Sequence, residues 1–230
     1  MNGISARLAA GSGAFFVVAA IVGNQLAASG APEGTDGPAA LAYLQRDPTP
    51  VNAAGFVLEI LGFAALLVFV GYLYRKLRRA EGADGWVAEV ACAAGVAGIA
   101  VKLGSIAPIA AGVNRRDELT VELARTLVDL NDAAFVVFGL LFGIFVTAAS
   151  AASSAYRMVP RWLGWIGVVL GTLAFGAGVV GIVAPDSYNP LAFVGGLVWT
   201  LVLSGILTAR AAPGPGRPEG AAVQAAAASV

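Results

Sequence analysis

Six long apolar segments, separated by short polar connections, dominate this sequence. A helix needs roughly 20 predominantly apolar residues to cross the hydrocarbon core of a bilayer. None of the segments alternates apolar and polar residues as a strand would. The segments are residues 13–28, 53–74, 87–108, 127–149, 162–183 and 191–208. We therefore predict an all-α fold, a polytopic membrane helix bundle with six transmembrane helices.

The charge content supports the same class. Only 12% of the residues are charged, whereas a soluble globular domain carries about 25%. So few charges cannot cover a water-exposed surface, and the lipid bilayer is the expected surroundings. The formal net charge is zero, so no basic field would attract nucleic acid.

The six segments leave no room for a separate soluble domain, so we predict one bundle domain over residues 1–210. Residues 211–230 are rich in Pro, Gly and Ala and are predicted to form a disordered tail. The first segment has two interpretations. Arg7 and the small residues at 27–29 resemble a cleavable signal peptide, whereas the polar Asn24 and Gln25 favour a retained helix.

Loop charges predict the orientation. Basic residues gather before the first segment, after the second, between the fourth and fifth, and after the sixth. They are Arg7, Arg75, Lys76, Arg78, Arg79, Arg157, Arg161, Arg210 and Arg217. Because basic loops stay in the cytoplasm, both termini and the tail are predicted to be cytoplasmic. The excess of Arg over Lys, with abundant Ala and Gly, indicates a GC-rich bacterial genome, and hence the bacterial inner membrane.

Lys102 lies inside the third apolar segment. A cation there is costly unless it faces the bundle interior and has a partner. A helix rises 1.5 Å per residue, which puts Glu59, Lys102 and Asp132 about 8–10 Å below the outer face. Glu59 and Lys102 are opposite charges on consecutive helices, which are usually neighbours.

We therefore predict a buried or half-buried network of Glu59, Lys102 and Asp132. Asn24, Gln25, Asp129 and Asn131 are expected around it. Asp129 and Asp132 are three residues apart and share a helix face, so Lys102 could neutralise either. Two interpretations stay open: a structural tie between helices, or a ligand-binding or catalytic site.

Aromatic residues accompany these acids. Phe56 and Phe63 flank Glu59 on its helix face, and Phe135 follows Asp132 by one turn. Trp199 lies in the middle of the sixth segment and is expected to face lipid or line a cavity. Acids ringed by aromatic faces can bind an apolar or cationic ligand, although ordinary packing also explains such residues.

Several kinds of chemistry are disfavoured. The chain has no histidine and a single cysteine, Cys92. It therefore lacks the common metal ligands and the usual general base near neutral pH. We predict no metal site and no cofactor.

Glycines at helical spacing occur in two segments. Gly139 and Gly143 form a GxxxG pattern in the fourth, and Gly167 and Gly171 form another in the fifth. Such patterns let helix backbones approach closely. They predict either packing of these two helices against each other or a homodimer or membrane complex.

Three further local features are predicted. Residues 39–45 are expected to form a short amphipathic helix in the membrane interface, with Leu41, Tyr43 and Leu44 as anchors. Pro108 is expected to end the third span. The polar stretch at 115–125 is expected to begin the fourth helix early.

Part of the chain resembles a known family. The resemblance rests on Asp129-Leu130-Asn131-Asp132, on residues 138–143, and on the Pro160-Arg161-Trp162-Leu163-Gly164 turn, with Tyr72-Leu73-Tyr74-Arg75 ending the second span. These motifs are similar to those of a bacterial family of six-span membrane proteins of unknown function, over about residues 50–205. The resemblance implies six helices and supplies no activity, ligand or catalytic residue.

Three functions fit these observations. The first is a protein that binds or passes a small amphiphilic molecule through the polar cluster. The second is a membrane cyclase or isomerase for a prenyl-type lipid, with Glu59 or Asp132 as the catalytic acid. The third is an accessory subunit of a larger membrane complex, bound through the glycine faces.

Overall fold

The computed structural model describes residues 3–29, 36–82 and 85–211, which are helical and contain no strand. The long helices are α1 (Gly3–Ala27), α3 (Pro50–Glu81), α4 (Val87–Asn114), α5 (Val121–Ala155), α6 (Arg161–Val183) and α7 (Leu191–Arg210). The shorter elements are α2 (Gly37–Gln45) and the 3-10 turns Arg116–Glu118 and Pro185–Ser187. The six long helices are each apolar and long enough to cross a membrane. The predicted multi-pass bundle is therefore confirmed, while the predicted tail lies outside the described residues.

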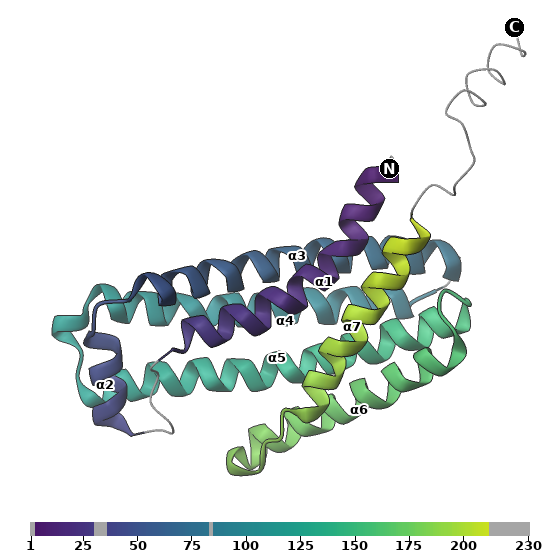
Figure 1. The fold of residues 1–230 in the computed structure, drawn as a ribbon. Coiled ribbons are helices and arrows are strands. Elements are labelled where there is room, and N and C mark those ends of the chain that lie inside the picture. The colour runs from purple at the N-terminus through teal and green to yellow at the C-terminus, as the bar shows by residue number, and fades with distance from the viewer. Residues whose placement is uncertain (1–2, 30–35, 83–84, 212–230) are drawn as a thin grey trace, which may run out of the picture.

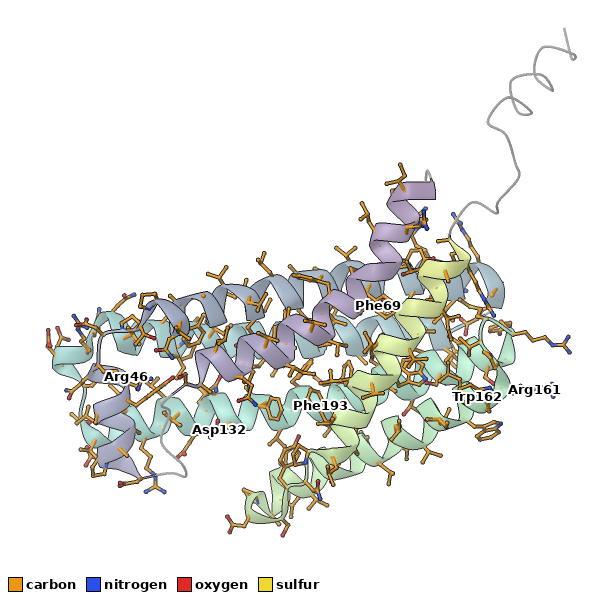
Figure 2. The ribbon with its side chains drawn as sticks, viewed as in Figure 1. Arg46, Phe69, Asp132, Arg161, Trp162 and Phe193 are labelled. Atoms are coloured by element: carbon orange, nitrogen blue, oxygen red, sulfur yellow. The ribbon has the colours of Figure 1, made fainter. Side chains whose placement is uncertain are left out.

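The helices form an elongated bundle (Figure 1). α3, α4 and α5 lie side by side, α1 runs along α3, and α7 crosses the bundle obliquely between α1 and α6. α1 begins and α7 ends at the same end, which we call the terminal end. α2 lies across the opposite end, which we call the α2 end. Arg161 and Trp162 mark the terminal end, and Arg46 marks the α2 end (Figure 2).

Several helices are longer than the apolar segments that predicted them. α3 has 32 residues and α5 has 35, well beyond the roughly 20 needed to span lipid. α5 begins at Val121 because the Thr120 side chain caps it by accepting a hydrogen bond from the Leu123 N–H. The early start predicted over residues 115–125 is therefore confirmed from Val121 onward, whereas Arg116–Glu118 forms a separate 3-10 turn.

Pro108 does not end its helix, so that prediction is wrong. α4 continues through Pro108 as far as Asn114. Proline removes one backbone hydrogen bond, but its ring is tolerated in membrane helices when neighbouring groups satisfy the freed carbonyl. The residue whose carbonyl faces the ring is Gly104, which has no side chain to add to the crowding.

A stack of phenylalanine rings fills the middle of the core. Phe16 of α1 and Phe63 of α3 have ring centroids 5.7 Å apart, and Phe63 meets Phe138 of α5 edge-on at 5.3 Å. Phe142 and Phe193 extend the stack to α7, with centroids 5.4 Å apart. Because Phe16 is fully buried in this stack, α1 is a bundle helix, as the retained-helix interpretation of this segment requires.

The glycine patterns join α5 to α6 inside the chain. A Cβ added at Gly143 would lie 2.7 Å from the Gly171 carbonyl oxygen, and one added at Gly171 would lie 2.7 Å from the Gly143 carbonyl oxygen. The two backbones therefore touch, as small residues allow. A second copy of the chain cannot use this face while α5 and α6 occupy it.

α2 forms where a short helix was predicted, and the three expected anchors, Leu41, Tyr43 and Leu44, pack against protein. Leu44 is buried with Ala40, Leu119 and Ala124, and Leu41 and Tyr43 pack partly against this cluster. The apolar face of α2 finds protein rather than lipid, because the start of α5 extends far enough to meet it. α2 thus covers the end of the bundle.

Candidate functional site

The site is framed by a close crossing of α1 and α3. A Cβ added at Gly23 would lie 2.8 Å from the Glu59 backbone nitrogen, and one added at Gly55 would lie 2.3 Å from the Ala27 nitrogen. Only glycine fits at such distances. The crossing fixes the backbone of Glu59 directly against α1.

Asn52 joins the same two helices. Its Nδ2 donates toward the carbonyl oxygens of Leu26, Ala27 and Ser29, at 3.1–3.2 Å. These carbonyls lie at and just beyond the end of α1, where a helix leaves carbonyls without intrahelical partners. The Leu26 carbonyl oxygen also accepts from the Ser29 N–H. Its Oδ1 accepts from the backbone N–H and the hydroxyl of Thr49, completing a capping box for α3. Asn52 therefore caps the end of α1 and the start of α3 together.

Lys102 and Glu59 form a buried ion pair. Lys102 Nζ lies 3.7 Å from Glu59 Oε1, and both residues are only 6% exposed. Nζ also donates to Asn131 Oδ1 at 3.2 Å and lies 6.0 Å from the centroid of the Phe135 ring. The ammonium is thus held by three helices: α3, its own α4, and α5.

Ser105 supports this arrangement from one turn away. Its hydroxyl lies 2.8 Å from the Lys102 carbonyl oxygen and 3.1 Å from Asn131 Oδ1, and it can donate to either. Asn131 Oδ1 therefore faces two donors on α4. This orientation leaves the Asn131 amide NH₂ to donate to Asp132, with which Asn131 forms a side-chain hydrogen bond.

A cavity of about 410 Å³ opens beside the ion pair. It lies among α1, α2, α3, α4 and α5, and Asp132 marks its position on α5 (Figure 2). Its polar lining residues are Asn24, Tyr43, Glu59, Lys102, Asn131 and Asp132. Its apolar lining residues are Ala27, Ala28, Phe56, Ile106, Ile109, Val128 and Phe135. We call this space the polar cavity.

A second cavity of about 320 Å³ adjoins the first. The two share Tyr43, Phe56, Ile106 and Ile109 as walls. The rest of its lining is mostly apolar: Leu44, Arg46, Pro48, Asn52, Ala53, Ala110, Val113 and Asn114. We call this space the apolar pocket. The charged space and the mostly apolar one therefore lie side by side against these four residues.

Polar contacts hold α2 over these cavities. The Tyr43 hydroxyl donates to the Ala27 carbonyl oxygen at 3.2 Å, and Arg46 donates to the Ser29 carbonyl oxygen at 2.6 Å. Arg116 pairs with Asp47, and this hydrogen-bonded carboxylate raises the pKa of the guanidinium. The guanidinium therefore stays charged at physiological pH.

The structure brings most of the predicted cluster together but not all of it. Asn24, Glu59, Lys102, Asn131, Asp132, Phe56 and Phe135 line the polar cavity. Asp129 instead pairs with Arg125 at 3.6 Å on the outer face of α5. Gln25 is exposed and is not part of the cavity lining.

Two predicted aromatic residues lie elsewhere. Phe63 belongs to the central stack of rings. Trp199 is 2% exposed and donates its indole N–H to the Leu163 carbonyl oxygen at 3.2 Å. It therefore fills the α6–α7 contact near the terminal end, and neither faces lipid nor lines the described cavities.

Sequence reasoning missed Asn52, Gly23 and Gly55. The signal for Asn52 is its position three residues after Thr49, which is the spacing of a capping box. Gly23 and Gly55 are on different helices, so a search for GxxxG within one helix does not find them. The sequence does contain a hint of this crossing. Gly55 lies one turn before Glu59, and Gly23 lies near the end of the first span.

Comparison with protein families identifies the chain's relatives. A family model described as a domain of unknown function, DUF4386, matches residues 11–211. The chain belongs to the DUF4386 family. The predicted family resemblance is thereby confirmed, and the match includes most of α1, which the predicted range left out. Comparisons of this DUF4386 protein with curated proteins and with solved structures find no match.

Proposed function

We propose that this protein binds a small amphiphilic molecule in the joined cavities beneath α2. The observation that carries the proposal is the shared wall of Tyr43, Phe56, Ile106 and Ile109 between a charged space and an apolar one. A polar head group fits beside Lys102, and an apolar tail fits along α4 toward the α2 end. Ligand sites are typically concave and mostly apolar, with a few polar groups that fix orientation.

The size of the site is suited to such a ligand. The two cavities measure about 410 and 320 Å³, within the usual range of about 300–1,000 Å³ for small-molecule sites. A structural tie between helices needs no adjoining space. The cavity next to the ion pair therefore favours a binding site over a tie alone.

The proposed location is the bacterial inner membrane, with the terminal end in the cytoplasm. The basic residues in the last turns of α3, around the α5–α6 connection and at the end of α7 support this orientation, because basic segments beside membrane helices remain cytoplasmic. The cavities then lie toward the outer leaflet. A ligand would enter from the outer leaflet or from the space outside it.

A tryptophan placed in the shared wall tests the proposal. Ile109→Trp fills the junction between the cavities, whereas Val169→Trp adds the same side chain on an exposed face of α6. Native mass spectrometry of protein extracted from its own membranes should show a bound small molecule in the wild type and in V169W. I109W should lose it while keeping its thermal stability. Identical spectra for the three proteins would refute the proposal.

A second candidate function is acid-catalysed isomerisation or cyclisation of a prenyl-type lipid. It is favoured by Asp132 and Phe135 in one cavity, because a carboxylic acid can donate a proton and an aromatic face can stabilise a carbocation. Glu59 fits the acid role less well, since Lys102 holds it as an ion pair. Membranes containing Asp132→Asn should form no product from prenyl substrates if this function is correct.

The accessory-subunit function has less support. The glycine faces that would bind a partner, around Gly143 and Gly171, are in contact with each other. A stable larger complex isolated in mild detergent would nevertheless favour it over ligand binding.

A further inference from the structure

We infer that the ligand of the polar cavity carries a positive charge: an alkylamine or quaternary ammonium amphiphile whose head group binds beside Asp132. This inference rests on the proposed function, because it assigns the chemical class of ligand to the same cavities. Three observations support it: the charges in the cavity lining, an aromatic ring in the same lining, and the pairing of the nearby cations with other groups.

The polar cavity holds more negative than positive charge. Its lining includes two carboxylates, Glu59 and Asp132, and one cation, Lys102. Lys102 is matched to Glu59 at 3.7 Å. Among the residues that the structure describes, Asp132 forms no ion pair. Asp132 is therefore the cavity carboxylate without an ion-paired cation, although Lys102 attracts it from a longer distance and Asn131 hydrogen-bonds to it.

Nearby cations outside this lining are engaged elsewhere. Arg125 pairs with Asp129 on the outer face of α5. Arg46 lines the apolar pocket, where its guanidinium lies 4.4 Å from the centroid of the Tyr43 ring and donates to the Ser29 carbonyl oxygen. Neither arginine is part of the polar cavity lining.

An aromatic ring adds to the cation site. Phe135 and Tyr43 line the cavity but already lie near cations: Lys102 Nζ is 6.0 Å from the Phe135 centroid, and the Arg46 guanidinium is 4.4 Å from the Tyr43 centroid. Phe56 lines the same cavity from α3 and is the ring that a bound ammonium would face. Ammonium groups bind against such rings, and a quaternary ammonium is recognised in this way without hydrogen bonds.

An anionic head group fits less well. It would need Lys102, whose Nζ is already beside the Glu59 carboxylate and donates to Asn131. Such a ligand would add a third negative charge to a cavity with a single cation, and like charges in a space of low dielectric repel strongly. A cation instead balances Asp132.

Photo-crosslinking with three matched probes tests this inference. Full-length protein in nanodiscs is incubated with an alkylammonium, a carboxylate and an alcohol, each with the same diazirine-bearing chain, and labelled peptides are mapped by mass spectrometry. We expect the ammonium probe to label cavity-lining residues and to half-saturate at the lowest concentration. Asp132→Asn should weaken this labelling about tenfold or more, which corresponds to the loss of a charged hydrogen bond.

Two variants make the result specific. Asp129→Asn removes a carboxylate from the same helix but from outside the cavity, so it should leave labelling unchanged. Asp132→Glu keeps the charge and should restore most of the labelling. If the carboxylate or alcohol probe labels the cavity as well as the ammonium does, the charge inference fails while the proposed function stands. If no probe labels the cavity, both fail.

Discussion

The buried pair of Lys102 and Glu59 leads to an asymmetric prediction. Lys102→Met leaves the Glu59 carboxylate, 6% exposed, without its cation. Glu59→Gln leaves Lys102 with its hydrogen bond to Asn131, the Phe135 ring and the cavity carboxylate of Asp132. The lysine substitution should therefore cost much more stability than the glutamate substitution.

The magnitudes follow from the geometry. At 3.7 Å and an effective dielectric constant of about 20, the pair attracts by about 4.5 kcal/mol before desolvation is subtracted. Removing one partner of a buried pair typically costs about 3–5 kcal/mol. We expect Lys102→Met to lower the free energy of unfolding by about 3 kcal/mol and Glu59→Gln by about 1 kcal/mol. The double variant should also lose about 1 kcal/mol, because no charge is left unpaired.

Unfolding in mixed micelles, followed by circular dichroism against the fraction of denaturing detergent, measures these differences. Arg125→Met is the matched control, because it removes a cation from the more exposed pair with Asp129 and should cost at most about 0.5 kcal/mol. Equal losses for K102M and R125M would refute the reasoning. The reasoning would also be refuted if the double variant lost as much free energy of unfolding as the two single variants added together.

Three further predictions concern packing, pH and topology. Gly23→Val should cost about 2 kcal/mol in the same unfolding assay, because the α3 backbone lies 2.8 Å from the added Cβ. Gly71→Val, which meets nothing within 4 Å, should be nearly neutral, and equal losses would contradict the close crossing. Burial raises the pKa of Tyr188, so its stabilising effect is present below its unfolded pKa of about 10 and lost as the pH rises above it. Tyr188→Phe should remove the loss of stability that Tyr188 causes at alkaline pH. An unchanged dependence of stability on pH would contradict this prediction. Ser187→Cys should react with a membrane-impermeant maleimide on intact cells, whereas the wild type, with Cys92 alone, should not. Labelling of Ser187→Cys only after lysis would indicate the opposite orientation.

The depth of the polar residues could be predicted because helical rise is fixed. Glu59 and Lys102 were placed at nearly equal depth from the span boundaries alone, and the structure pairs them at 3.7 Å. Six helices followed equally directly, since few other structures satisfy such long apolar segments in lipid. Depth therefore depends little on details of packing.

The rotation of each helix could not be predicted in the same way. Asp129 and Asp132 were expected to share the cluster, yet Asp129 turns toward Arg125, four residues earlier on its own helix. Trp199 and Phe63 were assigned by depth and neighbours, and both face other helices. Rotation is set by contacts such as Gly23 against α3, which join residues far apart in the sequence.

The most direct test of ligand binding beneath α2 is a cryo-EM density map of the native protein in lipid nanodiscs, with a bound antibody fragment to aid alignment. The binding proposal predicts elongated non-protein density that begins beside Asp132 and Phe135 and continues past Ile109 into the apolar pocket. Density should disappear in Ile109→Trp. A map in which α1 and α5 close onto each other, leaving no space beside Lys102, would contradict it.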